Sequence, residues 1–174
     1  LEGLEALAAR RKIKMIFLNP VFQNPTGTVM GAARKRAVLD FCAKARIPIV
    51  EDDAYSLLPF SPGVETAPLK ARDQGNRVLY AGSLSSYAGR NLRAGWLVAP
   101  KGVLNTLARA RHMMDAGLSV LPQLIGAEYL DHTAASHLPV IRKILAERAE
   151  RTAEQLRGAF GQTLDFALPS GGLY

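Results

Sequence analysis

The sequence predicts an α/β fold in which helices cover a mostly parallel β-sheet. Short apolar runs bounded by turn residues alternate with segments of helical periodicity, which is typical of buried parallel strands connected by helices. The chain has 174 residues, 48% of them hydrophobic, which is enough for one domain with its own core. No segment reaches the roughly 20 uncharged apolar residues that a membrane-spanning helix requires.

The first fifty residues predict two helices and two strands. Residues 1–11 form a charged, alanine-rich helical pattern that lacks the apolar centre of a signal peptide. The run KMIFLN at 14–19 indicates a buried strand, and the prolines and glycine of the next segment, 20–30, favour an irregular loop. Helical periodicity covers 31–46, and 47–50 is a second buried strand that leads into the acidic sequence EDDAY.

The remainder of the chain is organised around a third buried strand at 78–81. A Pro- and Gly-rich connection at 56–76 precedes it, and a Gly/Ser turn and an apolar run at 94–99 follow it. Beyond Pro100 we expect helices at 102–114, 118–130 and 139–160, then a strand at 163–168 and a turn at PSGG. We expect Trp96, Met113 and Met114 to be core or subunit-contact residues.

The basic surplus favours solvated helix faces. The 22 Lys and Arg residues outnumber the 15 acidic residues and give a net charge of +7, which can indicate nucleic acid or anionic ligands. The basic residues are spread through helical segments such as RKRAVLDFCAKAR, and no basic stripe is interleaved with aromatic residues. The pattern therefore does not predict a nucleic-acid groove in this chain.

Cysteine and histidine usage predicts a protein without disulfides or metal. Cys42 is the single cysteine, so no intrachain disulfide can form, which fits a reducing cytoplasm. The thiol lies in a helical segment, where a buried apolar role is expected. His112, His132 and His137 do not have the spacing of metal ligands, and we predict no metal site.

Three predicted strands end in polar, conformationally restricted sequences that should meet at one edge of the sheet. Ligands of open α/β sheets bind beyond the carboxyl ends of the strands. The first ending, QNPTG, holds the amide of Asn24 in a rigid loop, and the second places three acids at 51–53. The third is the small-residue turn 82–86, which suits an anion, with Arg93 a few residues further on as a planar cation for phosphate. This convergence predicts a binding site.

Each of these motifs also has a purely structural interpretation. NPTG alone is a good turn, and the acidic cluster could begin a helix, where the macrodipole favours carboxylates. A Gly/Ser turn can be a solvated strand-to-loop connection with an incidental arginine. Three such motifs in this order, each after a strand, make a more specific signal than any one of them.

The stretch RVLYAGSLSSYAGRNLRAGWLVAP at 77–100 resembles the lysine segment of fold-type I, pyridoxal-phosphate-dependent aminotransferases, whose usual form is GSFSKTLAPGLRLGW. The matching residues are Gly82, Ser83, Ser85, Leu92, Arg93, Gly95 and Trp96. The Schiff-base lysine of the family falls on Ser86. The sequences PVFQNPTG, EDDAY, GLSVLPQ and PSGGLY also resemble this family, so the resemblance runs from about Ile16 to the end.

The resemblance implies pyridoxal 5'-phosphate as cofactor and a role for each matched residue. Asn24 and Tyr55 would bind the ring oxygen, and Asp52 would bind the pyridine nitrogen. A carboxylate at that nitrogen keeps it protonated, which makes the ring an electron sink. The phosphate would be bound by the hydroxyls of Ser83 and Ser85 and by the guanidinium of Arg93.

Serine at the lysine position predicts a protein that does not transaminate as written. The lysine of the family binds the cofactor covalently and moves protons, whereas a serine hydroxyl forms no stable imine and is a poor base at neutral pH. Ser86 is either an alteration that traps a ligand or a natural loss in a protein that descends from an enzyme. Phosphate and pyridine contacts could still hold a cofactor non-covalently.

By this resemblance the chain is a fragment of a three-layer sandwich, the large domain of a pyridoxal-phosphate-dependent transferase. Residues 1–160 would be its central part and 161–174 the start of the small domain. We favour the effector-sensing domain of a GntR-family regulator of the MocR type. An amino-acid aminotransferase of the aminoadipate or kynurenine type that acts on a 2-oxo acid is the alternative. A cofactor-free scaffold is a third hypothesis, against which the retained binding residues argue.

The resemblance also implies partners. We expect a small-molecule amino acid or 2-oxo acid as ligand, a homodimer, a cytoplasmic location and no membrane contact. DNA would be bound only through a domain upstream of this chain, and a basic helix-turn-helix of about 70 residues there would distinguish the regulator from the enzyme.

Overall fold

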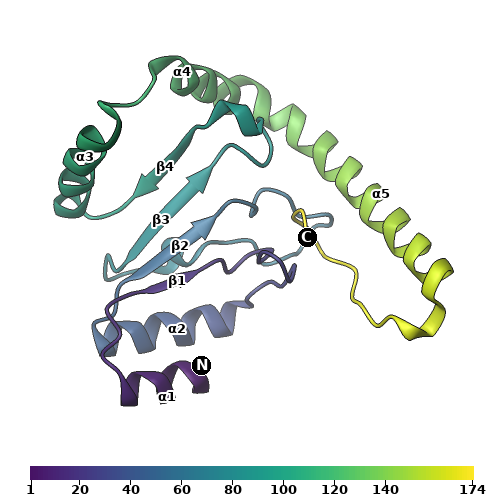
Figure 1. The fold of residues 1–174 in the computed structure, drawn as a ribbon, viewed down its shortest axis with the longest axis horizontal. Coiled ribbons are helices and arrows are strands. Elements are labelled where there is room, and N and C mark those ends of the chain that lie inside the picture. Colours follow the sequence, from purple (N-terminus) through teal and green to yellow (C-terminus); the bar gives the residue numbers. More distant parts are fainter.

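The structure is a computed structural model that describes residues 1–174, apart from the side chain of residue 115. Figure 1 shows one sheet bordered by helices. The strands are β1 (Ile16–Leu18), β2 (Ile49–Asp53), β3 (Val78–Ser83) and β4 (Gly95–Val98). The α-helices are α1 (Glu2–Arg10), α2 (Ala32–Ala45), α3 (Lys101–Asp115), α4 (Val120–Glu128) and α5 (Ala134–Phe160). A 3₁₀-helix covers Leu69–Arg72, and a π-helical turn at Tyr129–Thr133 joins α4 to α5.

The sheet has the order β1-β2-β3-β4, with the first three strands parallel and β4 antiparallel to β3. Ile16 pairs with Ile49, and Ile49 pairs with Val78. The carboxyl ends of β1, β2 and β3 therefore meet at one edge (Figure 1). The predicted α/β class and mostly parallel sheet are confirmed.

The main core lies between the sheet and α2. Ile49 and Val78 from the strands and Leu69 from the 3₁₀-helix are fully buried. Val38 and Cys42, one helical turn apart, present the apolar face of α2 to them, as the sequence period predicts. Burial raises the pKa of the Cys42 thiol, which keeps it protonated and unreactive.

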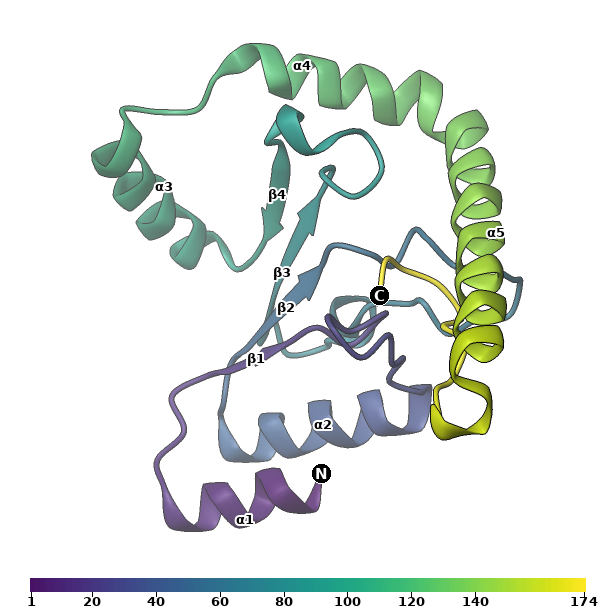
Figure 2. The ribbon, with the colours of Figure 1, turned by 45° about the vertical axis from the view of Figure 1, so that its right-hand side comes forward.

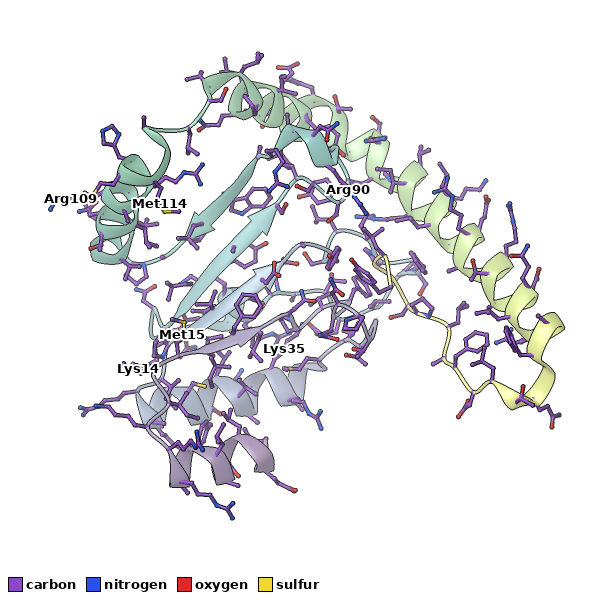
Figure 3. The ribbon with its side chains drawn as sticks, in the orientation of Figure 1. Lys14, Met15, Lys35, Arg90, Arg109 and Met114 are labelled. Carbon is purple, nitrogen blue, oxygen red and sulfur yellow. The ribbon has the colours of Figure 1, made fainter. Side chains whose placement is uncertain are left out.

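A buried lysine and a buried glutamate fasten the connection between β2 and β3. Lys35 of α2 is completely buried, and its ammonium donates hydrogen bonds to the carbonyl oxygens of Ala67 (2.6 Å) and Glu65 (3.3 Å). Glu51 of β2 accepts hydrogen bonds from the backbone N–H groups of Leu69 (2.6 Å) and Lys70 (2.9 Å). Figure 3 shows Lys35 on the side of α2 that faces the sheet.

We expect Lys35→Met to lower the free energy of unfolding by about 1–3 kcal/mol, because the half-buried carbonyl groups of residues 65 and 67 would lose their donor. Chemical denaturation measures this effect. Arg36→Met is the matched control, since Arg36 is the next residue of α2 and is exposed. Equal losses in the two variants would contradict the proposed anchoring role.

The helices α4 and α5 extend around the carboxyl end of the sheet in both ribbon views (Figures 1 and 2). A second cluster of buried residues, including Leu84, Tyr87, Ala134 and Leu138, fixes α5 to the turn after β3. The predicted start of this helix near Pro139 is wrong, because α5 begins at Ala134. Ala134 and Leu138 are one helical turn apart, and their burial stabilises the turn before the proline.

One further expectation is wrong, and another is narrowed. Residues 163–168 form no strand, because no strand of the described chain lies beside them to supply hydrogen bonds. Of the two alternatives for Met113 and Met114, core or subunit contact, the first does not hold within this chain, since the side chains are 87% and 80% exposed on α3, and the second stays a prediction. Trp96 is partly exposed, and its indole lies over the backbone of Gly82.

The end of the chain returns to the loops that follow β1 and β2 (Figure 1). Gly171 forms an isolated antiparallel bridge with Pro59. A Cβ atom at Gly171 would lie 2.2 Å from the Phe22 ring, so only glycine fits this close approach. The contact places Tyr174 beside Tyr55, with ring centroids 5.8 Å apart.

Candidate functional site

Asp52 lies on the opposite face of β2 from its two acidic neighbours. Side chains alternate along a strand, and Glu51 and Asp53 are buried on the α2 side of the sheet. The three acids are therefore part of a strand and do not begin a helix. Burial, and then the nearby charge of Asp53, raise the pKa of Asp52.

The Asp52 carboxylate has no donor among the side chains that the structure describes. The hydrogen bonds and ion pairs of the described residues include none to this group, although it is half-buried. A half-buried anion without a donor is unfavourable on its own and suits a ligand that brings a protonated nitrogen. This is the strongest local indication of a binding site.

Asn19 joins the loop that holds Asn24 to the end of β2. Its amide donates a hydrogen bond to the backbone oxygen of Asp52 (2.7 Å), and its side-chain oxygen accepts one from the backbone N–H of Asn24 (2.9 Å). We did not single out Asn19 from the sequence. Asn19 is the polar residue at the end of the first predicted strand, at the edge where ligands bind, and this position could have identified it.

Tyr55 completes the first half of the site. Burial raises the pKa of Tyr55, and interactions with Tyr174 and with Asp52 raise it further, whereas a hydrogen bond from Asn24 lowers it. Asn24, Asp52 and Tyr55 thus lie within mutual reach. A cavity of about 560 Å³ is lined by Asn19, Asn24 and Asp52, together with Phe17, Met30 and Arg34.

The second half of the site is the turn after β3. Ser83 is the last paired residue of β3, opposite Gly95, and its hydroxyl oxygen accepts a hydrogen bond from the N–H of Ser85 (3.2 Å). Arg93 has a left-handed backbone (φ 50°), an uncommon conformation for a side chain of this size. It lies next to Ala94, whose carbonyl oxygen accepts the N–H of Leu84 (3.0 Å). Ser86 is half-buried in the same turn.

The two halves share an edge of the sheet, and residues of each line a different hollow. Asp52 pairs with Ala81, so Ser83 lies two residues further along the neighbouring strand. Arg93 lines a separate hollow of about 700 Å³ between β4 and α3, together with Trp96. The structure therefore brings Asn24, Asp52 and Tyr55 together, and places Ser83, Ser85, Ser86 and Arg93 around one turn beside them.

The polar side chains of the two halves each suit a particular chemical group of a ligand. A carboxylate without a donor suits a protonated ring nitrogen, an amide and a phenol suit a ring oxygen, and hydroxyls with a guanidinium suit a phosphate. Within the described residues, no three His, Cys, Asp or Glu side chains gather in a way that could hold a metal ion. None of the described helices is long and apolar enough to cross a bilayer.

Comparison with known proteins relates the chain to regulators and to enzymes. The chain is 36% identical over 179 residues to the uncharacterized HTH-type transcriptional regulator YisV of Bacillus subtilis, covering 99% of this chain and 37% of YisV. It is 30% identical over 164 residues to the HTH-type transcriptional regulator NorG of Staphylococcus aureus, covering 94% of this chain and 37% of NorG. The chain thus spans little more than a third of these relatives.

Solved structures of aminotransferases share the fold. Kynurenine aminotransferase of Pyrococcus horikoshii, solved in complex with PMP, superposes with a TM-score of 0.90 at 30% identity, over 98% of this chain and 43% of the enzyme. The α-aminoadipate aminotransferase LysN of Thermus thermophilus, complexed with N-(5'-phosphopyridoxyl)-L-leucine, gives 0.91 at 28% identity, over 98% and 44%. The sequence profile of the family "Aminotransferase class I and II" matches residues 1–174. The chain therefore belongs to the class I and II aminotransferase family.

Proposed function

We propose that this chain binds pyridoxal 5'-phosphate and serves as the effector-sensing domain of a GntR-family regulator of the MocR type. The Asp52 carboxylate, which lacks a donor beside Asn24 and Tyr55, is the observation that carries the cofactor proposal. The similarity to two HTH-type transcriptional regulators over at least 94% of this chain supports the regulatory role.

Each residue of the site has a proposed task toward the cofactor. Asp52 would bind the protonated ring nitrogen, and Asn24 and Tyr55 would bind the ring oxygen. The phosphate would be held by Ser83, Ser85 and Arg93. When bound, the cofactor ring supplies an electron sink for chemistry on an amino acid.

Ser86 stands in the position of the family's lysine, and a serine there fits ligand sensing better than transamination. A hydroxyl can donate or accept a hydrogen bond, but it cannot hold an aldehyde covalently in a stable way or move a proton efficiently at neutral pH. A sensor needs the pocket to bind its ligand without turning it over. We therefore propose a non-covalent cofactor site without transaminase activity.

An amino-acid aminotransferase, altered at the lysine position, is the second candidate. The superposition on kynurenine and α-aminoadipate aminotransferases favours it. The ligand in either case would be an amino acid or a 2-oxo acid, and we propose a cytoplasmic homodimer with a domain boundary near residue 160. A DNA-binding domain upstream of residue 1 would support the regulator, and a DNA affinity that responds to cofactor and amino acid would support sensing.

Phosphate recognition provides a direct test of the cofactor proposal. We expect the protein to bind pyridoxal 5'-phosphate about 10–100-fold more tightly than pyridoxal, because charge-assisted hydrogen bonds contribute roughly 1.5–3 kcal/mol. Arg93→Ala should remove most of this difference. Calorimetric titration of both ligands measures it.

Arg90→Ala is the matched control for this test. Arg90 is also exposed and lies in the same loop (Figure 3), but it is outside the proposed phosphate site. We expect the control to keep the preference for the phosphorylated ligand. Equal affinity for both ligands in the unaltered protein would refute the proposed phosphate site.

A further inference from the structure

A buried hydrogen-bond network lies behind the turn that follows β2 and carries Tyr55. Asp53 is 7% exposed and accepts three hydrogen bonds. The backbone N–H of Ser56 donates to one carboxylate oxygen (3.1 Å), and the Ser56 hydroxyl donates to the other (2.6 Å). The hydroxyl of Tyr80 donates to that second oxygen (2.7 Å). Both oxygens of Asp53 are thus occupied within the protein.

These contacts fix the backbone on both sides of Tyr55. Asp53 ends β2, and Ser56 directly follows Tyr55, so the Asp53–Ser56 bonds close the turn on which the tyrosine is carried. Tyr80 belongs to β3, the neighbouring strand, and ties this closed turn to the sheet. The carbonyl of Tyr55 also accepts the N–H of Leu58 (2.9 Å).

We propose that Asp53, with Tyr80 and Ser56, is a positioning residue that holds the Tyr55 ring beside Asn24 and Asp52. The functional meaning of that position rests on the proposed cofactor site, but the positioning itself does not require the cofactor. Asp53 faces the α2 side of the sheet, away from Asp52, so it acts on a ligand only through the turn.

Glu51 provides an internal comparison. It is also a buried carboxylate, two residues earlier on the same face of β2, and it accepts hydrogen bonds from two backbone N–H groups. Its partners are Leu69 and Lys70, in the connection to β3, and not the Tyr55 turn. Loss of Glu51 should therefore weaken the fold without releasing Tyr55.

The first test uses the protein without cofactor. Tyrosine labelled with ¹³C in the ring allows the Tyr55 phenol to be titrated by NMR, with its signal assigned from Tyr55→Phe. We expect Ser56→Ala and Tyr80→Phe, two mild changes, to move the pKa of Tyr55 down toward its ordinary value, because the ring leaves its half-buried position. Glu51→Gln should leave this pKa unchanged. An unchanged Tyr55 pKa in both network variants would overturn the inference.

The second test is a double-mutant cycle on the affinity for pyridoxal 5'-phosphate. We expect Tyr80→Phe with Ser56→Ala to weaken binding by about 5–30-fold, which corresponds to roughly 1–2 kcal/mol, and to have no further effect in a Tyr55→Phe background. Glu51→Gln should leave the affinity unchanged while lowering the melting temperature. An equal loss with and without Tyr55 would show that the network does not act through this residue.

Failure of the proposed function can be distinguished from failure of this inference. If the unaltered protein does not bind pyridoxal 5'-phosphate, but the Tyr55 pKa responds to the network variants, the cofactor proposal falls and the positioning role stands. If the cofactor binds and neither the pKa nor the affinity responds, the positioning role falls and the cofactor proposal stands.

Discussion

Ser86→Lys is expected to raise the affinity for pyridoxal 5'-phosphate by roughly 100-fold or more, about 3 kcal/mol, and to leave the affinity for pyridoxamine 5'-phosphate nearly unchanged. A lysine amine at this position can form a carbon–nitrogen bond with the aldehyde of the first ligand, with loss of water. The second ligand carries an amine in place of the aldehyde and cannot react. The unaltered protein should bind the two ligands with similar affinity, because a serine does not distinguish them covalently.

Absorbance and borohydride trapping measure this result. The lysine variant should gain a band shifted toward the visible region, and borohydride should convert the complex into a stable adduct at residue 86. Asn91→Lys is the control, because residue 91 is exposed in the same loop and lies outside the proposed site. If the lysine variants at 86 and 91 behave alike, residue 86 does not occupy the proposed lysine position.

The parallel strands and the polar edge could be predicted because each depends on local sequence. Uninterrupted apolar runs indicated the parallel strands, and the turn residues after them indicated where a ligand edge would form. The segment 163–168 was predicted wrongly because alternating apolar residues do not show whether a strand has a neighbour. The helical pattern of Met113 and Met114 left core and subunit contact open, because which face of α3 is covered depends on tertiary contacts.

The different faces and partners of the three consecutive acids could not be predicted from the sequence either. A helix start would have placed Glu51, Asp52 and Asp53 on one solvated turn, whereas the strand alternates them between two faces. Glu51 and Asp53 then bind partners 18 and 27 positions away, Leu69 and Tyr80, and no local pattern shows such distant pairs. The family resemblance identified Asp52 but not the two anchors beside it.

Asp52→Asn is expected to stabilise the protein in the absence of cofactor while weakening cofactor binding. The pKa of Asp52 is raised in the folded state, first by burial and then by the charge of Asp53. An acid with a raised folded pKa favours folding fully below its unfolded pKa, near 3.9, and this contribution is lost as the pH rises through the folded pKa. At neutral pH the ionised carboxylate therefore destabilises the unliganded protein relative to a neutral amide.

The stability difference between Asp52→Asn and the unaltered protein should therefore be small near pH 3 and grow as the pH rises. At pH 7 we expect the variant to melt about 2–4 °C higher, the shift that roughly 1 kcal/mol produces in a domain of this size. Asp40→Asn, a change of an exposed acid on α2, is the matched control. Thermal melts at several pH values measure both.

The same substitution should weaken binding of pyridoxal 5'-phosphate by about 10–100-fold, since a charged hydrogen bond to the ring nitrogen is worth roughly 1.5–3 kcal/mol. A substitution that raises the stability of the protein but lowers its affinity for the ligand identifies a binding residue and not a structural one. Loss of a structural residue such as Glu51 lowers stability, whereas loss of a group kept without a donor for its ligand raises it. If Asp52→Asn lowers both quantities, Asp52 is part of the framework of the fold, and the ring nitrogen of any cofactor must be bound elsewhere.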